Sequence, residues 1–408
     1  MTGTAIAQAI PLLLSPVLSR LYDPEDFATL ALFMSVASML GVVSTARYEL
    51  AIMLPKSQRD AMNVLMLSIG IAVLVSVFSL VLILIFHDDI LRLFSAPELS
   101  VWLYFVPLMV LFMGVYQSFN YWSTRNKTFT RNSVSRISQS VGMSAVNLSL
   151  GAVGAGPAGL VSGSFTGQFI AALVLSWNAI LHPRDWRKNF SYDSIRLNAV
   201  KYSSFARINT PHAFVDTLQD HGIVFIIIYY FSKVVLGSYS FAYRVLKAPV
   251  GLIGSSMYQV FYQKASSTYH EGGDIRPMLV RIYRNLFLLG LPVFLVLFLF
   301  SPEIFSFVFS EKYRTAGEIA QLLMPWLFLN FMVMPVTCIA IVVNRQRGAF
   351  LISVTDVVLK VVALVVGGIT GDYELAFGLM SILCSLLLIF AMFWYYRISG
   401  VKFVKSYE

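Results

Sequence analysis

Long runs of apolar residues recur along the whole chain and are separated by short polar segments. The apolar positions are continuous and do not alternate every second residue, which favours helices over strands. Each run holds about 20 residues, enough for a helix to cross a hydrocarbon core of about 30 Å. The pattern predicts twelve membrane-spanning helices, at residues 3–19, 27–48, 63–86, 101–122, 138–155, 158–181, 208–231, 236–263, 285–309, 318–343, 348–370 and 373–396.

The composition indicates that lipid is the solvent for much of the chain. Of the 408 residues, 57% are hydrophobic and only 12% are charged, whereas a soluble domain carries about 25% charged residues. Only helices and closed barrels satisfy their backbone groups in lipid. The predicted fold class is therefore an all-α polytopic membrane protein. Cys338 and Cys384 lie in apolar runs, and we expect them to be small core residues and not disulfide or metal ligands.

Basic residues are distributed unevenly between the two sides of this pattern. The segments after even-numbered helices, together with the C-terminal tail, hold 21 of the 30 Lys and Arg residues, and the segments after odd-numbered helices hold 5. Cytoplasmic segments of membrane proteins are enriched in Lys and Arg. The sequence therefore predicts that both termini are cytoplasmic. Because this topology explains the net charge of +9, we expect no nucleic-acid partner.

A long polar segment, residues 182–207, divides the chain after the sixth predicted helix. It contains Pro183 and six basic residues. We expect an N-terminal lobe of six helices at 1–181, this segment as a basic cytoplasmic linker, and a C-terminal lobe of six helices at 208–408. Since six helices return the chain to the cytoplasmic side, the lobes are expected to be parallel repeats, related by an axis along the membrane normal.

The N-terminal 60 residues carry a motif that resembles the opening of a known family. The motif reads LSRLYDPEDF at 18–27, followed by ARYELAI at 46–52 and Leu54-Pro55. This stretch is similar to bacterial polysaccharide-biosynthesis flippases of the multidrug/oligosaccharidyl-lipid/polysaccharide exporter superfamily. The hydropathy pattern matches that family over essentially the whole chain.

The resemblance implies two lobes around a central cationic cavity that opens to each side of a bacterial inner membrane in turn. It implies a flippase that moves a polyprenyl-pyrophosphate-linked oligosaccharide to the outer leaflet, for O-antigen, capsule or exopolysaccharide synthesis. Its expected partners are this lipid-linked sugar, membrane lipid and other membrane proteins of polysaccharide assembly. We expect no cofactor and no enzymatic activity.

Four basic residues fall inside the predicted helices: Arg47, Arg244, Lys247 and Lys360. A charge at the centre of a membrane helix costs about 2.5–3.5 kcal/mol and needs water or a partner. Arg244 and Lys247 are three residues apart and share a helix face, so they are candidates to bind the substrate pyrophosphate. Arg47 is either a third substrate ligand or a cation that reaches the cytoplasmic headgroups. Arg20 offers the same two interpretations on the outer side.

Acidic residues also fall inside the predicted helices, at Asp216, Asp220 and Asp356, with Glu49 at the edge of the second helix. Asp216 and Asp220 are one turn apart. They either balance the basic residues or couple transport to an ion gradient, because low dielectric moves carboxyl pKa values towards neutrality. Asp356 and Lys360 have the spacing of a helical ion pair, and we expect a structural pair.

Two other functions remain as alternatives. The first is an ion-coupled exporter of organic cations from the same superfamily, which is expected to have an acidic cavity and a carboxylate in the first helix. The first predicted helix contains neither Asp nor Glu. The second is a membrane enzyme that polymerises sugar repeats, which is expected to have a large outside loop with catalytic residues. The longest predicted outside segment is 87–100, and no nucleophile–base pair or metal-ligand set is evident.

Overall fold

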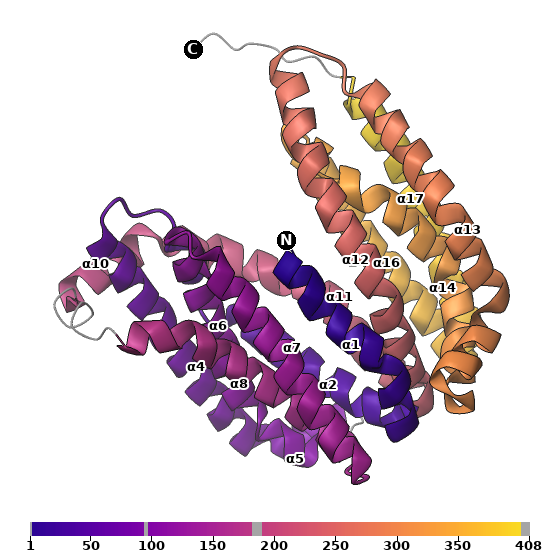
Figure 1. Cartoon of the computed structure of the whole chain (residues 1–408), viewed down its shortest axis with the longest axis horizontal. Helices are drawn as coiled ribbons and strands as arrows, with labels where there is room; N and C mark the ends of the chain where they lie inside the picture. The colour runs from indigo at the N-terminus through magenta and orange to yellow at the C-terminus, as the bar shows by residue number, and fades with distance from the viewer. Residues whose placement is uncertain (1, 94–96, 182–189, 401–408) are drawn as a thin grey trace. The chain divides into compact units, whose positions relative to one another are not determined.

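The computed structural model describes residues 2–93, 97–181 and 190–400, and every regular element in these ranges is a helix (Figure 1). The helical contacts divide the chain into two compact units, Met1–Tyr229 and Tyr230–Glu408. The predicted all-α polytopic membrane fold is confirmed. The helix Thr210–Tyr230 groups with the first unit by its contacts, so the predicted lobe boundary at 182–207 stays a prediction.

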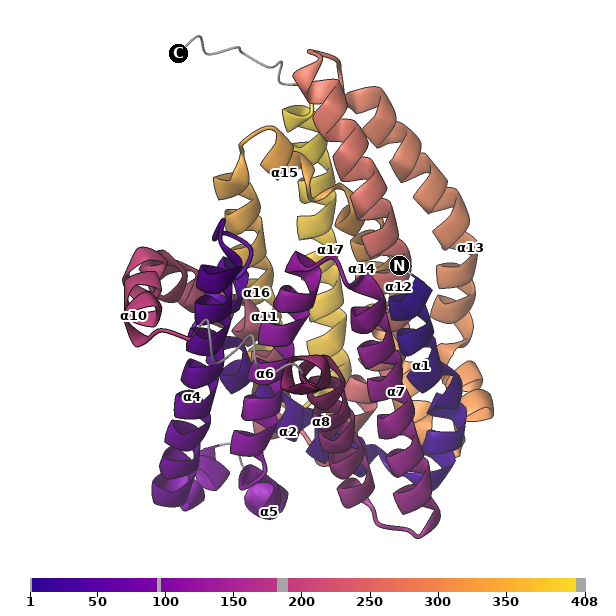
Figure 2. The same ribbon diagram turned by 60° about the vertical axis from the view of Figure 1, so that its left-hand side comes forward.

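The first unit contains ten α-helices among the described residues, together with a 3₁₀-helix at Pro97–Leu99 and a π-helix at Phe205–Asn209. The α-helices are α1 Thr2–Leu21, α2 Pro24–Val43, α3 Tyr48–Ala51, α4 Gln58–Leu93, α5 Ser100–Leu103, α6 Val106–Arg125, α7 Phe129–Ala152, α8 Pro157–Leu181, α10 Tyr192–Lys201 and α11 Thr210–Tyr230. Helix α7 packs against both α1 and α8, and α4 packs against α6 (Figure 2).

The second unit contains six α-helices among the described residues, together with 3₁₀-helices at Glu311–Tyr313 and Met334–Val336. The α-helices are α12 Lys233–His270, α13 Arg276–Phe309, α14 Arg314–Val333, α15 Ile339–Val342, α16 Gln346–Thr370 and α17 Tyr373–Ile398. Side-chain caps begin two of them, because Ser232 accepts from the Val235 N–H (3.3 Å) and Asp372 from the Leu375 N–H (3.0 Å). Gly371, with φ of 71°, ends α16.

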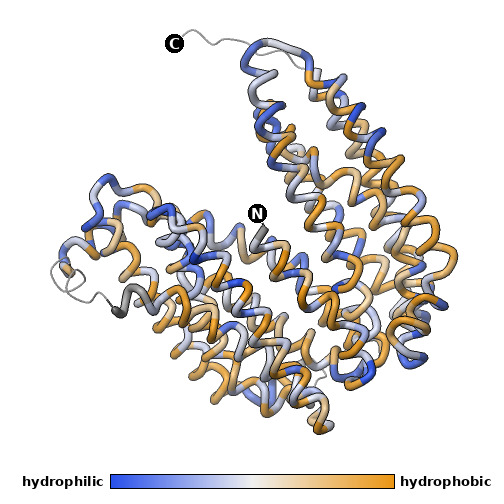
Figure 3. The backbone as a smooth tube through the Cα atoms, in the orientation of Figure 1, coloured by the Kyte–Doolittle hydropathy of each residue, from blue (hydrophilic) through white to orange (hydrophobic). Residues whose placement is uncertain are grey.

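The helices meet the length that a membrane requires. Twelve of those in the described ranges have 20 residues or more, and each overlaps one predicted span. Eight stretches are also apolar enough to cross a membrane, while α6, α7, α11 and α12 are more polar. Figure 3 shows hydrophobic residues along the helices and hydrophilic ones at many of their ends. Side chains such as Leu288 and Leu289 of α13 are more than 60% exposed, as expected where a helix faces lipid.

Three predicted spans end early or are interrupted in the structure, while others, such as the span predicted at 285–309, begin earlier than predicted. The span predicted at 27–48 ends at Val43, because Ala46 and Arg47 adopt positive φ angles of 46° and 60° that no α-helix contains. The span predicted at 101–122 is divided between α5 and α6, and the span predicted at 318–343 ends as α14 at Val333. Pro107 and Pro335 lie at these two breaks, where their missing N–H groups are tolerated.

The segment predicted as a linker contains a helix that the sequence analysis missed. Helix α10 packs against α4, and its N-cap Ser191 donates its backbone N–H to Asn63 Oδ1 at 3.1 Å. Ser194 Oγ donates to Asp60 Oδ1 at 3.1 Å. Its mixed polar and apolar sequence lacks the continuous run by which the other helices were found. Residues 182–189 of the predicted linker lie outside the described ranges.

The glycine-rich segment 151–163 permits close helix packing. The ring of Tyr22 fills the space beside Gly151 and Gly159, where an added Cβ would lie within 2.8 Å and 2.0 Å of ring or hydroxyl atoms. The Tyr22 hydroxyl donates to the Asn147 carbonyl at 2.6 Å. Tyr22 belongs to the N-terminal motif, so part of that motif serves packing of α1 against α7 and α8.

We predict that Gly317→Ala destabilises the second unit. A Cβ at Gly317 of α14 would lie 2.6 Å from the Ser301 carbonyl oxygen and 2.6 Å from Pro302 Cα of α13. Backbone atoms move only with their helix, and such overpacking costs about 1–3 kcal/mol. The melting temperature of the purified protein should fall. Gly378→Ala is the matched control, because it meets no atom within 4 Å and alanine favours a helix by about 1 kcal/mol. Equal melting temperatures for the two variants would show that this contact is not tight.

Candidate functional site

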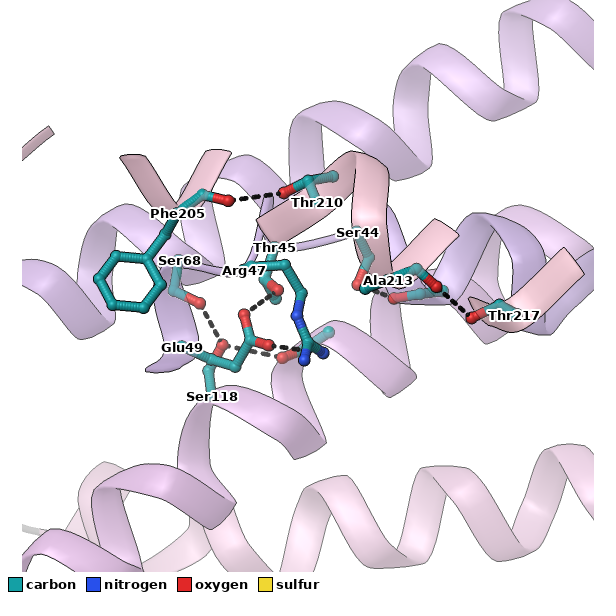
Figure 4. Close-up of polar contacts among 12 residues, drawn as sticks. Ser44, Thr45, Arg47, Glu49, Ser68, Ser118, Phe205, Thr210, Ala213 and Thr217 are labelled. Carbon is teal, nitrogen blue, oxygen red and sulfur yellow. Dashed lines mark hydrogen bonds and ion pairs between the residues drawn. The ribbon is translucent and has the colours of Figure 1, made fainter. Parts of the chain in front are cut away.

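Arg47 and Glu49 form an ion pair at the start of α3, after the turn that follows α2. Arg47 Nη1 lies 3.3 Å from Glu49 Oε1, and the two side chains point towards one another in Figure 4. Residues two apart on a helix do not face each other. Arg47, the N-cap of α3, has a left-handed backbone like Ala46, and this turn brings its side chain onto Glu49 inside α3.

Of the two side chains in this pair, only the Glu49 carboxylate is fully buried. Glu49 is 2% exposed and also accepts a hydrogen bond from Thr45 Oγ1, whereas Arg47 is 28% exposed. The Nε of Arg47 is buried and has no hydrogen-bond partner among the described residues. Burial raises the pKa of the Glu49 carboxyl, and the Thr45 hydrogen bond and the Arg47 charge act in the opposite direction. The pair thus presents one guanidinium with unused donors.

A rigid frame holds the turn that carries Arg47. Tyr48 is 7% exposed and lies in an apolar cluster with Ile52, Leu65 and Phe119. Its hydroxyl donates to the Ala199 carbonyl of α10 at 2.8 Å. Helix α10, absent from the sequence prediction, therefore supports the segment next to Arg47.

Arg244 and Lys247 lie one turn apart on α12, as predicted. Arg244 is partly buried and makes no hydrogen bond or ion pair with any residue that the structure describes. Lys247 is exposed, and its Nζ lies 4.8 Å from the centre of the Tyr243 ring.

Four stacked aromatic rings connect this face to the rest of the second unit. We call Trp326, Tyr243, Tyr239 and Phe377 the aromatic ladder. Neighbouring ring centres are 6.1, 5.7 and 5.3 Å apart, with planes inclined by 6°, 10° and 9°. The rings come from α12, α14 and α17. Stacked rings prefer such offset arrangements, so the ladder fixes α12 against two neighbouring helices.

Lys360 lies at the Trp326 end of the aromatic ladder. Its Nζ is 4.7 Å from the Trp326 ring centre and 2.5 Å from Asp356 Oδ2. The two charged side chains are 13% and 24% exposed. The contact between Asp356 and Lys360 therefore forms as its spacing predicts, and the structural role of the pair stays a prediction. The cation–π contact is not evident from the sequence, because Trp326 lies on a different helix.

The other predicted site residues are more exposed. Asp216 Oδ2 lies 3.1 Å from Nδ1 of His212, four residues earlier on α11, and both side chains are more than half exposed. Asp220 is exposed on the same helix, while its neighbour His221 lies 3.4 Å from Ser35 Oγ of α2. Arg20 is exposed in the last turn of α1. The buried Cys338 and Cys384 carry free thiols.

Comparisons with known proteins agree with this architecture. The profile of the family described as "Polysaccharide biosynthesis protein" matches residues 17–318. The fold is similar to the lipid II flippase MurJ in an inward closed conformation, with a TM-score of 0.74 and 16% identity over 98% of this chain and 90% of that one. No curated protein sequence matches the chain.

Two further solved structures have a similar fold. An inward-facing MATE-family multidrug resistance transporter gives a TM-score of 0.72 at 15% identity, over 97% of this chain and 94% of that one. A superfamily transporter from Pyrococcus furiosus, described as having a binding pocket of reverse polarity, gives a TM-score of 0.62 at 14% identity. The match covers 98% of this chain and 94% of that one. At these identities the likeness shows the fold alone. The neighbours are transporters and flippases and not enzymes.

We predict that Asp356 and Lys360 depend on one another. Removing one partner of a buried ion pair costs about 3–5 kcal/mol, because the remaining charge is left without compensation. Lys360→Ala should therefore lower membrane abundance and melting temperature, and adding Asp356→Ala should recover much of both. The control is Arg314→Ala, whose pair with Glu318 spans 3.9 Å and is largely exposed, so its loss should have little effect. A double variant as poor as the worse single variant would refute a purely structural pair.

Proposed function

The chain belongs to the polysaccharide biosynthesis protein family, and from this premise we propose that it is a flippase for a polyprenyl-pyrophosphate-linked oligosaccharide. The substrate would pass from the cytoplasmic to the outer leaflet of a bacterial inner membrane by alternating access, for O-antigen, capsule or exopolysaccharide synthesis. Both termini are cytoplasmic in this proposal. The family and the multi-pass membrane fold support it.

The cation on α12 is the observation that carries the proposal. Arg244 is partly buried in a long helix and has no acidic partner among the described residues. A charge held within a membrane helix without a protein partner requires water or an anionic ligand. A pyrophosphate supplies such a ligand, since Arg offers a planar fork for two oxygens and Lys247, one turn away, offers a point charge.

Arg47 supports the same chemistry in the first unit. One nitrogen of its guanidinium meets Glu49, while Nε has no partner among the described residues. A second anionic group could therefore bind without breaking the Glu49 contact. We assign Arg20 to the outer headgroup region as a weaker contributor.

We keep ion coupling at Asp216 and Asp220 within the proposal. Both carboxylates are exposed on α11 and one turn apart, so a proton or a cation could reach them. The exporter of organic cations is the weaker function here. Helix α1 holds neither Asp nor Glu, and α12 presents cations where such a substrate needs acids.

We predict that Arg244→Gln with Lys247→Gln lowers glycan export at unchanged membrane abundance. Glutamine keeps polarity and removes charge, and a hydrogen bond to a charged group contributes about 1.5–3 kcal/mol. Export in cells should fall at least about tenfold, and more for Arg244→Gln than for Lys247→Gln. The control, Arg345→Gln with Arg347→Gln, removes the same charge from exposed positions at the start of α16. Export at the unmodified rate in the first double variant would exclude a cationic phosphate site on α12.

A further inference from the structure

A crevice opens where α12 ends and α13 begins, and the proposed transport mechanism does not use it. Helices α12 and α13 both pack against α14, and they make few contacts with each other. Their junction therefore leaves a cavity of about 600 Å³. Figure 3 shows hydrophilic residues gathered at this end of the two helices.

The lining of this crevice has a basic, polar part and an apolar part. Lys264 of α12 and Arg281 of α13 supply two cations, and Thr268 and Asn285 add neutral polar groups. The single acid in the lining, Asp274, already accepts the Arg276 backbone N–H at 2.9 Å. Neither Lys264 nor Arg281 forms an ion pair or hydrogen bond with another residue that the structure describes. The polar lining is therefore net positive and has unused donors.

The other part of the lining is apolar. Met257, Val260 and Ile282 lie in the same crevice as the two cations. Val260 is 68% exposed, so part of the apolar wall is open at the surface of the second unit. A small soluble anion would satisfy the cations and leave this wall uncovered.

The position of the crevice along the helices fits a membrane surface. In the predicted topology the junction of α12 and α13 is cytoplasmic. Tyr258, Tyr262 and Tyr269 of α12 and Tyr283 of α13 lie along the same stretch. Tyrosine is enriched at the level of lipid headgroups, and basic pockets between helices on the cytoplasmic side bind anionic headgroups.

We propose that the crevice between α12 and α13 is a binding site for an anionic phospholipid. The phosphate lies between Lys264 and Arg281, and an acyl chain covers Met257, Val260 and Ile282. Charge complementarity selects an anionic headgroup over a zwitterionic one, and the apolar wall selects a lipid over free phosphate. The site is separate from Arg244 and Lys247, so it can be tested whether or not the chain is a flippase.

Lipid binding to the purified full-length protein tests this site directly. Binding is measured by native mass spectrometry and by melting temperature, with dioleoylphosphatidylglycerol, dioleoylphosphatidylcholine or inorganic phosphate added. Each basic residue near an anionic lipid contributes a factor of about five in affinity, so Lys264→Gln with Arg281→Gln should weaken phosphatidylglycerol binding roughly 25-fold. Lys264→Arg with Arg281→Lys should retain it. Lys56→Gln with Arg59→Gln removes two exposed cations from the first unit and should bind as the unmodified protein does.

Three results would overturn the assignment. These are equal binding of the two lipids by the unmodified protein, undiminished phosphatidylglycerol binding by the Lys264→Gln and Arg281→Gln variant, or equal stabilisation by inorganic phosphate alone. None of these measurements depends on glycan transport, so failure of the lipid site and failure of the proposed flippase are distinguishable.

Discussion

Each charge inside a membrane helix needs a partner or water, and this requirement organises the second unit. Lys360 meets both Asp356 and the face of Trp326, and Lys247 lies over Tyr243. Since Tyr243 and Trp326 stack on one another, the two lysines lie along one chain of contacts that crosses α12, α14 and α16. Arg244 follows Tyr243 in the same helix and has no acidic partner among the described residues.

In the first unit, α2 ends before Arg47, and this charge finds its partner in a turn. Ala46 and Arg47 leave the helical conformation, and the turn brings Arg47 onto Glu49, which is almost fully buried. Tyr48 anchors the turn in an apolar cluster and on α10. A left-handed backbone at a non-glycine residue is unfavourable and persists only where its surroundings determine it. Strain at a cation with unused donors is consistent with a site that binds an anion.

Much of the fold was predictable because membrane helices leave a simple signal. Each of the twelve long helices in the described ranges overlaps a predicted span, although four of them are less apolar than the other eight. The spacing of Asp356 and Lys360 predicted their contact. Features that depend on contacts between distant parts of the chain could not be predicted from the sequence. Nothing in the sequence near Arg47 indicates positive φ at two residues without a glycine. Helix α10 has no apolar run, and the aromatic ladder joins residues from three helices whose neighbours the sequence does not specify.

Reconstitution of the purified chain into vesicles measures flipping without other cellular components. A fluorescent polyprenyl-pyrophosphate oligosaccharide in the inner leaflet reports its arrival in the outer leaflet. We expect flipping well above that of protein-free vesicles, and competition by an unlabelled pyrophosphate lipid but not by an organic cation. Flipping no faster than in protein-free vesicles, together with export of a cationic dye by the same preparation, would contradict a flippase and favour a cation exporter on the same fold.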